Sequence, residues 1–244
     1  MLTRFTILFS IALLLGASCA CAAPPVDRFP AAVGDLRITF LKHASLMFNF
    51  RNTIIQVDPV ARMADYNALP KADIILVTHD HADHFEPDTI KRISKQGAKV
   101  ILTATCARKL AGGIVLANGE ETTVAGINIL AVPAYNLVHK RDNGEPYHPK
   151  GRDNGYLLTL GDKRLYVAGD TENIPEMKGL TAIDIAFLPM NLPYTMTPEM
   201  LADAVLCFKP KVLYPYHFSG SDPAELTTIM KEFPATEVRV REMP

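Results

Sequence analysis

The chain has 244 residues, of which 48% are hydrophobic and 21% are charged, and its formal net charge is -1. This composition is typical of a folded globular protein and excludes collagen-like, coiled-coil and disordered chains. The length suffices for one large domain with a sizeable core. A near-neutral charge argues against a general nucleic-acid-binding protein, which usually carries a basic excess. We therefore expect no nucleic-acid partner.

The first 22 residues have the pattern of a secretory signal peptide. Arg4 precedes an apolar run over residues 5–15, and small residues follow, with Ala20 and Ala22 in an A-x-A arrangement. The run is shorter than the roughly 20 residues that span a bilayer. We expect cleavage after Ala22, no stable membrane span afterwards, and a periplasmic or secreted protein.

The cysteines are too few for a disulfide scaffold, since the chain has 4 of them. Cys19 or Cys21 would be lipidated if the leader is that of a bacterial lipoprotein. Cys106 and Cys207 remain after cleavage. They either pair in an oxidising compartment or stay as buried free thiols.

Residues 23–34 are expected to form an extended leader, and residues 35–244 a single domain. In chain order, the patterns predict strands over 36–41, 45–50, 53–57, 73–78, 99–102, 122–132 (as two stretches), 155–160, 164–167, 183–188, 212–214 and 236–240. They predict helices over 87–96, from Thr197 to 208, and from Asp222 onward. Such an order favours two packed sheets covered by helices.

One polar segment, residues 135–154, is too long for an ordinary connection. It is rich in glycine and proline and carries two of the seven histidines. A loop of this length inside a compact domain is usually functional or disordered.

A dense group of possible metal ligands directly follows the apolar run that ends at Val77. Residues 78–84 read Thr-His-Asp-His-Ala-Asp-His, so His79, His81, Asp83 and His84 fall within six positions. Imidazole and carboxylate groups are ligands for zinc, iron and manganese. The sequence therefore predicts a metal site at the end of this strand.

The spacing His79-x-His81-x-Asp83-His84 resembles the signature of the metallo-β-lactamase superfamily. The likeness extends over about residues 36–240. It implies an α/β (α+β) protein with the αββα sandwich of that superfamily, and a two-metal site at one edge of the paired sheets. It also implies that His79 and His81 bind the first metal, and that Asp83 and His84 bind the second.

Two later motifs stand in the order that this resemblance requires. Gly169-Asp170-Thr171 follows a strand and resembles the element whose aspartate bridges both metals. Tyr214-Pro215-Tyr216-His217 resembles the element that supplies the last ligand of the second metal. The resemblance thus assigns Asp170 and His217 to the site.

The remaining ligand of the first metal is less determined. Many members of the superfamily have a histidine in the region that matches residues 132–136, where this chain has Asn136. Residues 147–151, Tyr-His-Pro-Lys-Gly, resemble an element of one branch and favour His148. His139, Asn136, a water in its place, and a single-metal site remain alternatives.

Residues 41–46 resemble the opening strand of the branch that contains ascorbate-6-phosphate lactonases and N-acyl-phosphatidylethanolamine phospholipase D. His43 is therefore expected near the metals, as a supporting or substrate-facing group, or else as a structural residue. Asp58 is expected to accept a hydrogen bond from a ligand histidine or to cap a strand. Residues 191–196 would line the substrate pocket or form a structural turn.

The resemblance implies an exported hydrolase with two divalent metal ions, zinc first and manganese or iron as alternatives. A metal-bound hydroxide would attack an ester, lactone or phosphodiester bond of a small-molecule substrate, with Asp83 and His43 as the catalytic candidates. A β-lactamase-type amide hydrolase and a metal-binding protein with a degenerate site are the alternatives. A diiron oxidoreductase is disfavoured because the chain has no room for a flavin domain. The oligomeric state is not predicted.

Overall fold

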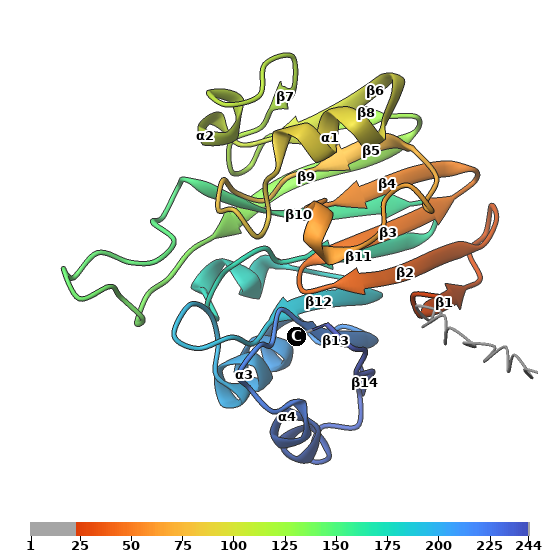
Figure 1. The fold of residues 1–244 in the computed structure, drawn as a ribbon. Coiled ribbons are helices and arrows are strands. Elements are labelled where there is room, and N and C mark those ends of the chain that lie inside the picture. The colour runs from red at the N-terminus through yellow and green to blue at the C-terminus, as the bar shows by residue number, and fades with distance from the viewer. Residues whose placement is uncertain (1–22, 244) are drawn as a thin grey trace, which may run out of the picture.

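The structure is a computed structural model that describes residues 23–243. The expected signal peptide, with its cleavage and lipidation positions, lies outside the described residues. The strands of residues 23–243 form two sheets of seven strands each, and helices cover their outer faces (Figure 1). Within residues 23–243, none of the helices has the length and apolar character needed to cross a bilayer.

The first sheet takes its strands in chain order from the N-terminal half. These are β1 (Val26–Phe29), β2 (Leu36–Lys42), β3 (Ser45–Phe50), β4 (Thr53–Val57), β5 (Ala72–Leu76), β6 (Ser94–Leu102) and β7 (Ile114–Val115). The pairs from β1 to β4 are antiparallel, and those from β4 to β7 are parallel. Strand β5 lies in the parallel part and is covered on both faces, which explains its almost continuous apolar sequence.

The second sheet repeats this plan with the C-terminal half. Its strands are β8 (Glu121–Val124), β9 (Ile127–Ala134), β10 (Asp153–Leu160), β11 (Lys163–Val167), β12 (Ile185–Pro189), β13 (Val212–Tyr216) and β14 (Glu237–Val238). The pairs from β8 to β11 are antiparallel, and those from β11 to β14 are parallel. Parallel strands end at a common sheet edge, so residues that follow β11 and β13 lie near each other.

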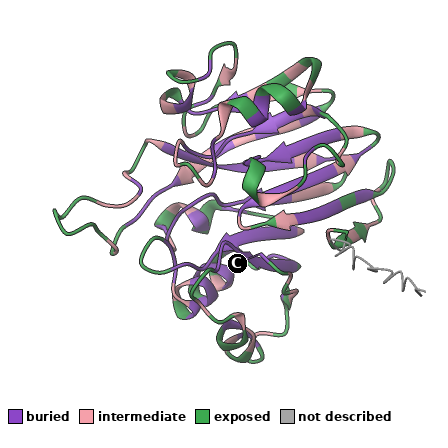
Figure 2. Cartoon of the chain, in the orientation of Figure 1, coloured by how far each residue is buried: buried purple, intermediate pink, exposed green. Residues whose placement is uncertain are grey.

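Helices complete the sandwich on both sides. Helices α1 (Pro87–Ile93) and α2 (Ala104–Ala107) pack through Ile90, Ile93 and Cys106 against the outer face of the first sheet. Helices α3 (Pro198–Phe208) and α4 (Pro223–Met230) cover the second sheet together with the 3-10 turn η2 (Pro175–Gly179); a further 3-10 turn, η1 (Ala61–Met63), follows β4. The strands between these layers are largely buried (Figure 2). The expected αββα sandwich is therefore confirmed.

The segment expected as an extended leader belongs to the first sheet. Within residues 23–34, strand β1 pairs with β2. Asp27 in β1 accepts hydrogen bonds from the Nη2 of Arg241, at 2.6 Å to Oδ2, and from the hydroxyl of Tyr214. These contacts hold the first strand against residues close to the C-terminus.

The helix expected over residues 87–96 ends earlier, at Ile93. Ser94 adopts an extended conformation and pairs with Ala72. Gly97, with φ of 81°, then lies inside strand β6 instead of after a helix. Pairing with β5 therefore overrides the helical pattern of residues 94–96. Strands β1 and β7 and helix α2, each of four residues or fewer, were not expected.

The two cysteines of the described residues do not pair. Cys106 lies on the buried side of α2, whereas Cys207 is exposed on α3. The expectation of two buried thiols is thus correct only for Cys106.

Candidate metal centre

The motif of residues 78–84 folds into a tight turn after β5. The backbone N–H groups of His84 and Phe85 both donate to the carbonyl oxygen of His81, at 3.0 and 2.9 Å. The turn folds the chain back on itself, so side chains from neighbouring positions can reach a common point.

The second sheet and its loops bring three further groups to this turn. Asp170 follows β11, His217 follows β13, and His148 lies in the loop between β9 and β10. Gly169 has φ of 66°, and a Cβ atom there would lie 2.7 Å from the carbonyl oxygen of Asn154. Only glycine fits this position, so the Gly-Asp pair is the element that presents Asp170 to the site.

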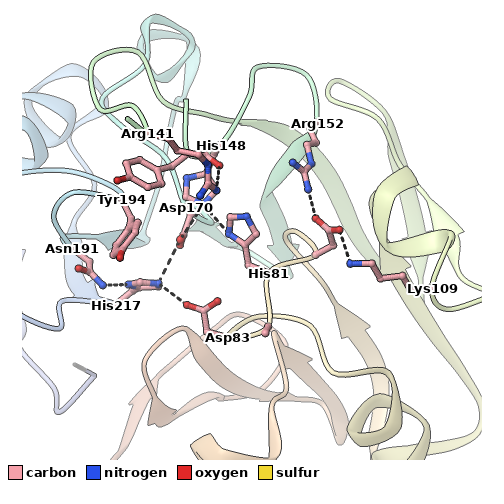
Figure 3. Close-up of a pocket in the computed structure, with 13 residues that line it drawn as sticks. His81, Asp83, Lys109, Arg141, His148, Arg152, Asp170, Asn191, Tyr194 and His217 are labelled. Carbon is pink, nitrogen blue, oxygen red and sulfur yellow. Dashed lines mark hydrogen bonds and ion pairs between the residues drawn. The ribbon is translucent and has the colours of Figure 1, made fainter. Parts of the chain in front are cut away.

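These groups converge into one cluster (Figure 3). The ligand atoms of His79, His81 and His148 lie within 4.8 Å of one another, and so do those of His79, His84 and Asp170. The Asp170 carboxylate lies between the histidines, at 3.4 Å from the Nε2 atoms of His84, His148 and His217 and 4.0 Å from that of His79. Asp170 therefore has the central position expected of a bridging ligand.

Three imidazoles are oriented by oxygen atoms that lie outside the cluster. The Nδ1 atom of His79 donates to Thr78 Oγ1 at 3.0 Å, that of His84 to Asp58 Oδ2 at 2.8 Å, and that of His148 to Asn136 Oδ1 at 2.8 Å. A proton on Nδ1 leaves the lone pair on Nε2, which faces the cluster in each case. This is the arrangement that prepares a histidine to bind a metal.

Asp58 was expected either to accept a hydrogen bond from a cluster histidine or to cap a strand. Its carboxylate accepts hydrogen bonds from the backbone N–H of Thr78 at 2.8 Å, from Thr78 Oγ1 at 2.7 Å and from His84 at 2.8 Å. The side chain is fully buried. Asp58 thus both orients a cluster histidine and fixes the start of the turn.

Burial and charge set the protonation states of the cluster. Burial lowers the pKa of His148 to about 4, and it lowers the pKa of His81 and, more strongly, of His79. Burial also opposes charge on His84, but the neighbouring Asp170 carboxylate raises the pKa of that imidazole well above its usual value. For Asp170, burial favours the neutral acid, yet His217 and His84 hold its pKa well below the usual range. The imidazoles of His79, His81 and His148 are therefore neutral beside an ionised carboxylate, which suits metal binding, and His84 would release its Nε2 proton to a metal bound there.

Several buried polar atoms of the cluster lack a hydrogen-bond partner, and this shows whether the cluster suits a metal ion. Among the described residues, four cluster atoms are buried without a hydrogen bond, namely the Nε2 atoms of His79, His84 and His217 and Oδ1 of Asp170. Each such atom costs about 1–3 kcal/mol when it stays unpaired. In addition, His81 Nδ1 and His148 Nε2 face each other at 3.3 Å. Cations bound among these atoms would satisfy them, so the residues fit divalent metal ions.

His43 contacts Asp83 and His217, and its ring nitrogen lies within 4.8 Å of the ligand atoms of Asp83, His84 and His217. Its Nε2 atom donates to Asp83 Oδ2 at 3.2 Å, and its ring packs on that of His217 with centroids 3.6 Å apart. Its carbonyl oxygen also accepts from the His217 N–H at 3.1 Å. His43 is not among the described residues that line the cavity over the cluster. Its place is that of a supporting residue for Asp83 and His217.

The structure separates the three candidates for the remaining ligand. His148 lies in the cluster, as described above. Asn136 supports it, because Oδ1 accepts hydrogen bonds from both the backbone N–H and Nδ1 of His148, at 2.8 Å each. His139 points elsewhere, and its Nδ1 atom donates to Glu172 Oε1 at 2.7 Å.

Glu172 is a buried carboxylate that sequence reasoning missed. It accepts hydrogen bonds from Asn136 Nδ2 at 3.0 Å and, at 2.7 Å each, from the N–H groups of Leu137, Val138 and His139 and from His139 Nδ1. These bonds lower its pKa although burial alone raises it. A single glutamate after Gly-Asp-Thr carries no sequence signal for this role, because its partners lie more than 30 positions away.

A cavity of about 490 Å³ opens over the cluster. Its floor contains His81, Asp83, His148, Asp170 and His217. Figure 3 shows Lys109 and Arg152 on one side of the floor, and Arg141, Asn191 and Tyr194 on the other. The long loop over 135–154 and the segment over 191–196 both contribute to the lining of this cavity.

The cationic wall residues were also missed by sequence reasoning. Lys109, Arg141 and Arg152 stand in polar stretches where positive charges are common. The one available signal is that two of them lie in the long loop already expected to be functional.

Comparisons with known proteins agree with this geometry. Residues 37–217 match the model of the family described as the beta-lactamase superfamily domain. A UPF0173 metal-dependent hydrolase of Thermus thermophilus is 32% identical over 198 residues, which cover 77% of this chain and 86% of that protein.

Solved structures extend the comparison to the fold. A crystal structure of a Parabacteroides distasonis protein, described as a metal-dependent hydrolase, is 48% identical, with a TM-score of 0.86, and the match covers 91% of this chain and 100% of that one. Igni18, a metallo hydrolase of Ignicoccus hospitalis, is 25% identical with a TM-score of 0.70, over 85% of this chain and 95% of that one.

Proposed function

This chain belongs to the beta-lactamase superfamily domain family and is a metal-dependent hydrolase of the metallo-β-lactamase superfamily; from that premise we propose which residues hold two metal ions and what bond is cleaved. His79, His81 and His148 would hold the first ion. Asp83, His84 and His217 would hold the second, and Asp170 would be shared between them. The main support for this assignment is the set of buried nitrogen and oxygen atoms around Asp170 that have no hydrogen-bond partner.

Zinc is the proposed metal, because neutral imidazoles and carboxylates are its preferred ligands in such a set. Two divalent ions, when bound, supply Lewis acidity and activate water for attack on an electrophilic centre. The bond cleaved is an ester, lactone or phosphodiester of a small molecule, as the cavity of about 490 Å³ accommodates such a ligand.

Asp83 is the proposed proton acceptor. It lines the cavity, and its side chain is 32% exposed, in contrast with the buried histidines around it. The hydrogen bond from His43 and the nearby His217 imidazole keep its pKa below the usual range, against the effect of burial. The carboxylate is therefore ionised and can accept a proton from an attacking water. His43 acts as a positioning residue that fixes the Asp83 carboxylate.

Export is also part of this proposal. It is supported by the charged start, apolar run and A-x-A pattern of residues 1–22. The near-neutral charge of the chain is consistent with a small-molecule substrate.

Metal analysis of two variants tests the ligand assignment. His81→Ala and Asp170→Ala should each lower the bound metal and abolish turnover, while circular dichroism shows an intact fold. His139→Ala is the matched control, because this histidine lies on the same loop as His148 but outside the cluster, and it should retain the metal of the unaltered protein. Unchanged metal content in both cluster variants would contradict the assignment. Turnover of lactone, phosphodiester and β-lactam substrates then identifies the bond.

A further inference from the structure

Arg141 is a cavity residue whose guanidinium has no ion-pair partner within residues 23–243. Among the described residues, no carboxylate lies within ion-pair distance of its guanidinium. The side chain makes one long hydrogen bond, from Nη2 to the carbonyl oxygen of Tyr147 at 3.4 Å, and it is exposed toward the cavity. An exposed guanidinium in such a place keeps its capacity to bind an anion.

The opposite wall differs in this respect. Asp80 accepts hydrogen bonds from Arg152 Nη2 at 2.5 Å and from Lys109 Nζ at 2.8 Å. Both cations are thus engaged by one carboxylate. Among the described residues that line the cavity, no carboxylate engages Arg141 as Asp80 engages Arg152 and Lys109. Figure 3 shows the two walls on either side of the histidine cluster.

The position of Arg141 is built by a short turn of the long loop. Its N–H donates to the carbonyl of Glu145, and its own carbonyl accepts from Gly144, both at 2.8 Å. Lys140 and Pro146 pair as an isolated bridge beside them. The guanidinium carbon lies 4.9 Å from the ring centre of Tyr147. Backbone bonds and ring contact together hold the side chain over the cavity.

The charge of the cavity points to an anionic ligand. Three cations, Lys109, Arg141 and Arg152, and three carboxylates, Asp80, Asp83 and Asp170, line it and offset one another. Bound divalent cations therefore leave the loaded cavity positively charged.

Aromatic side chains flank Arg141 on the same wall. The rings of Tyr147 and Tyr194 meet edge to face with centroids 4.9 Å apart, and Tyr194 is 44% exposed. Both rings line the cavity, and Tyr147 contacts the Arg141 guanidinium, so they offer an apolar surface beside it.

We propose that Arg141 binds an oxyanion, either a carboxylate or a phosphate, at the end of the substrate away from the bond that is cleaved. This inference rests on the proposed hydrolase function and names the class of substrate: a short molecule whose alkyl or aryl arm lies along Tyr147 and Tyr194. Arg141 forms hydrogen bonds to the terminal oxyanion, and the electrophilic group reaches the cluster.

The binding of matched carboxylate and phosphonate ligands tests the role of Arg141 independently of catalytic activity. Butyrate and glutarate share one carboxylate and a short chain, and they differ in a second carboxylate at the far end. Succinate and adipate vary the distance, and 4-phosphonobutyrate replaces the far carboxylate by a phosphonate. Their affinities for the zinc-loaded full chain are measured by ligand-observed NMR.

We expect the best dianion to bind about tenfold more tightly than butyrate, because only the dianion forms the additional charge-assisted hydrogen bond to Arg141. In Arg141→Gln the ratio should fall below about twofold. Lys140→Gln is the control, because it removes a neighbouring charge of the same turn that does not line the cavity, and it should keep the ratio. Whether the carboxylate or the phosphonate series shows the larger ratio identifies the oxyanion.

Three results would overturn the inference: a ratio near one for every dianion, an unchanged ratio in Arg141→Gln, or an equal fall in Lys140→Gln. Failure of the proposed function is distinguishable from these. If the loaded protein selects dianions through Arg141 but hydrolyses no ester, lactone or phosphodiester, the binding site stands and the reaction is wrong.

Discussion

Replacing Glu172 by glutamine tests how the loop that carries His148 is held in place. The carboxylate is fully buried and accepts five hydrogen bonds from residues 136–139. Through Asn136 this group is linked to the Nδ1 atom of His148. Glutamine has the same shape, so the substitution leaves no cavity and changes only charge and hydrogen bonding.

The expected cost follows from the donors that lose an acceptor. Oε2 accepts from the N–H groups of Leu137 and Val138, and Oε1 accepts from three other donors. Whichever oxygen becomes an amide nitrogen, at least two donors are left unpaired, at about 1–3 kcal/mol each. Leu137 and Val138 are exposed, so water can reach this part of the loop. We therefore expect a loss of about 2–4 kcal/mol and a fall in Tm of roughly 4–16 °C.

Thermal unfolding of the zinc-loaded protein, followed by circular dichroism, measures this loss. Glu176→Gln is the matched control, since Glu176 accepts from Lys150 Nζ at 2.8 Å and from the Tyr135 hydroxyl at 2.9 Å but lies at the surface. Such a pair contributes about 0.2–1 kcal/mol. If Glu172→Gln lowers Tm no more than this control does, the reasoning about the loop is refuted.

Three further predictions concern other parts of the fold. Burial alone would raise the pKa of Asp27, but hydrogen bonds from Arg241 and Tyr214 lower it. The fall in Tm caused by Asp27→Asn should therefore be largest above about pH 4. It should shrink as the pH falls through the lowered pKa of Asp27. A pH-independent loss would contradict this. Burial raises the pKa of the Cys106 thiol to about 11, so iodoacetamide followed by peptide mapping should label Cys207 in the folded protein and Cys106 only in denaturant; equal labelling would disagree. Finally, a Cβ atom at Gly155 would lie 2.6 Å from the carbonyl oxygen of Ala168, so Gly155→Ala should cost about 1–3 kcal/mol, and a Tm unchanged from that of the parent would argue against the close approach.

The part of the site that sequence predicts is the part that is local. Four of the proposed ligands, His79, His81, Asp83 and His84, lie within six positions after a buried strand, and one turn brings them together. A metal site can be predicted from these residues because their spacing and the preceding strand alone bring them close together. The order of sheets and helices was predictable for the same reason, since most neighbouring strands are also neighbours in the chain.

The choice among His148, His139 and Asn136 depends on a contact that the sequence does not display. Both histidines occupy the same polar loop, and Glu172, 33 positions after His139, draws that histidine away from the cluster. The two arginines of the loop differ likewise, because Asp80 engages Arg152 from 72 positions away and leaves Arg141 open. Such long-range pairings decide which residues of a functional loop are available.

The division of the chain into two sheets has a consequence for folding. Each sheet consists of one contiguous half, so its strands can pair over short sequence separations, which favours fast local assembly. The motif at residues 79–84 belongs to the first half, whereas His148, Asp170 and His217 belong to the second. Neither half holds all of the proposed ligands, so the cluster forms only after the sheets dock. Metal binding would then lock the last step of assembly, so that a chain halted with undocked halves is both inactive and unable to retain its metals.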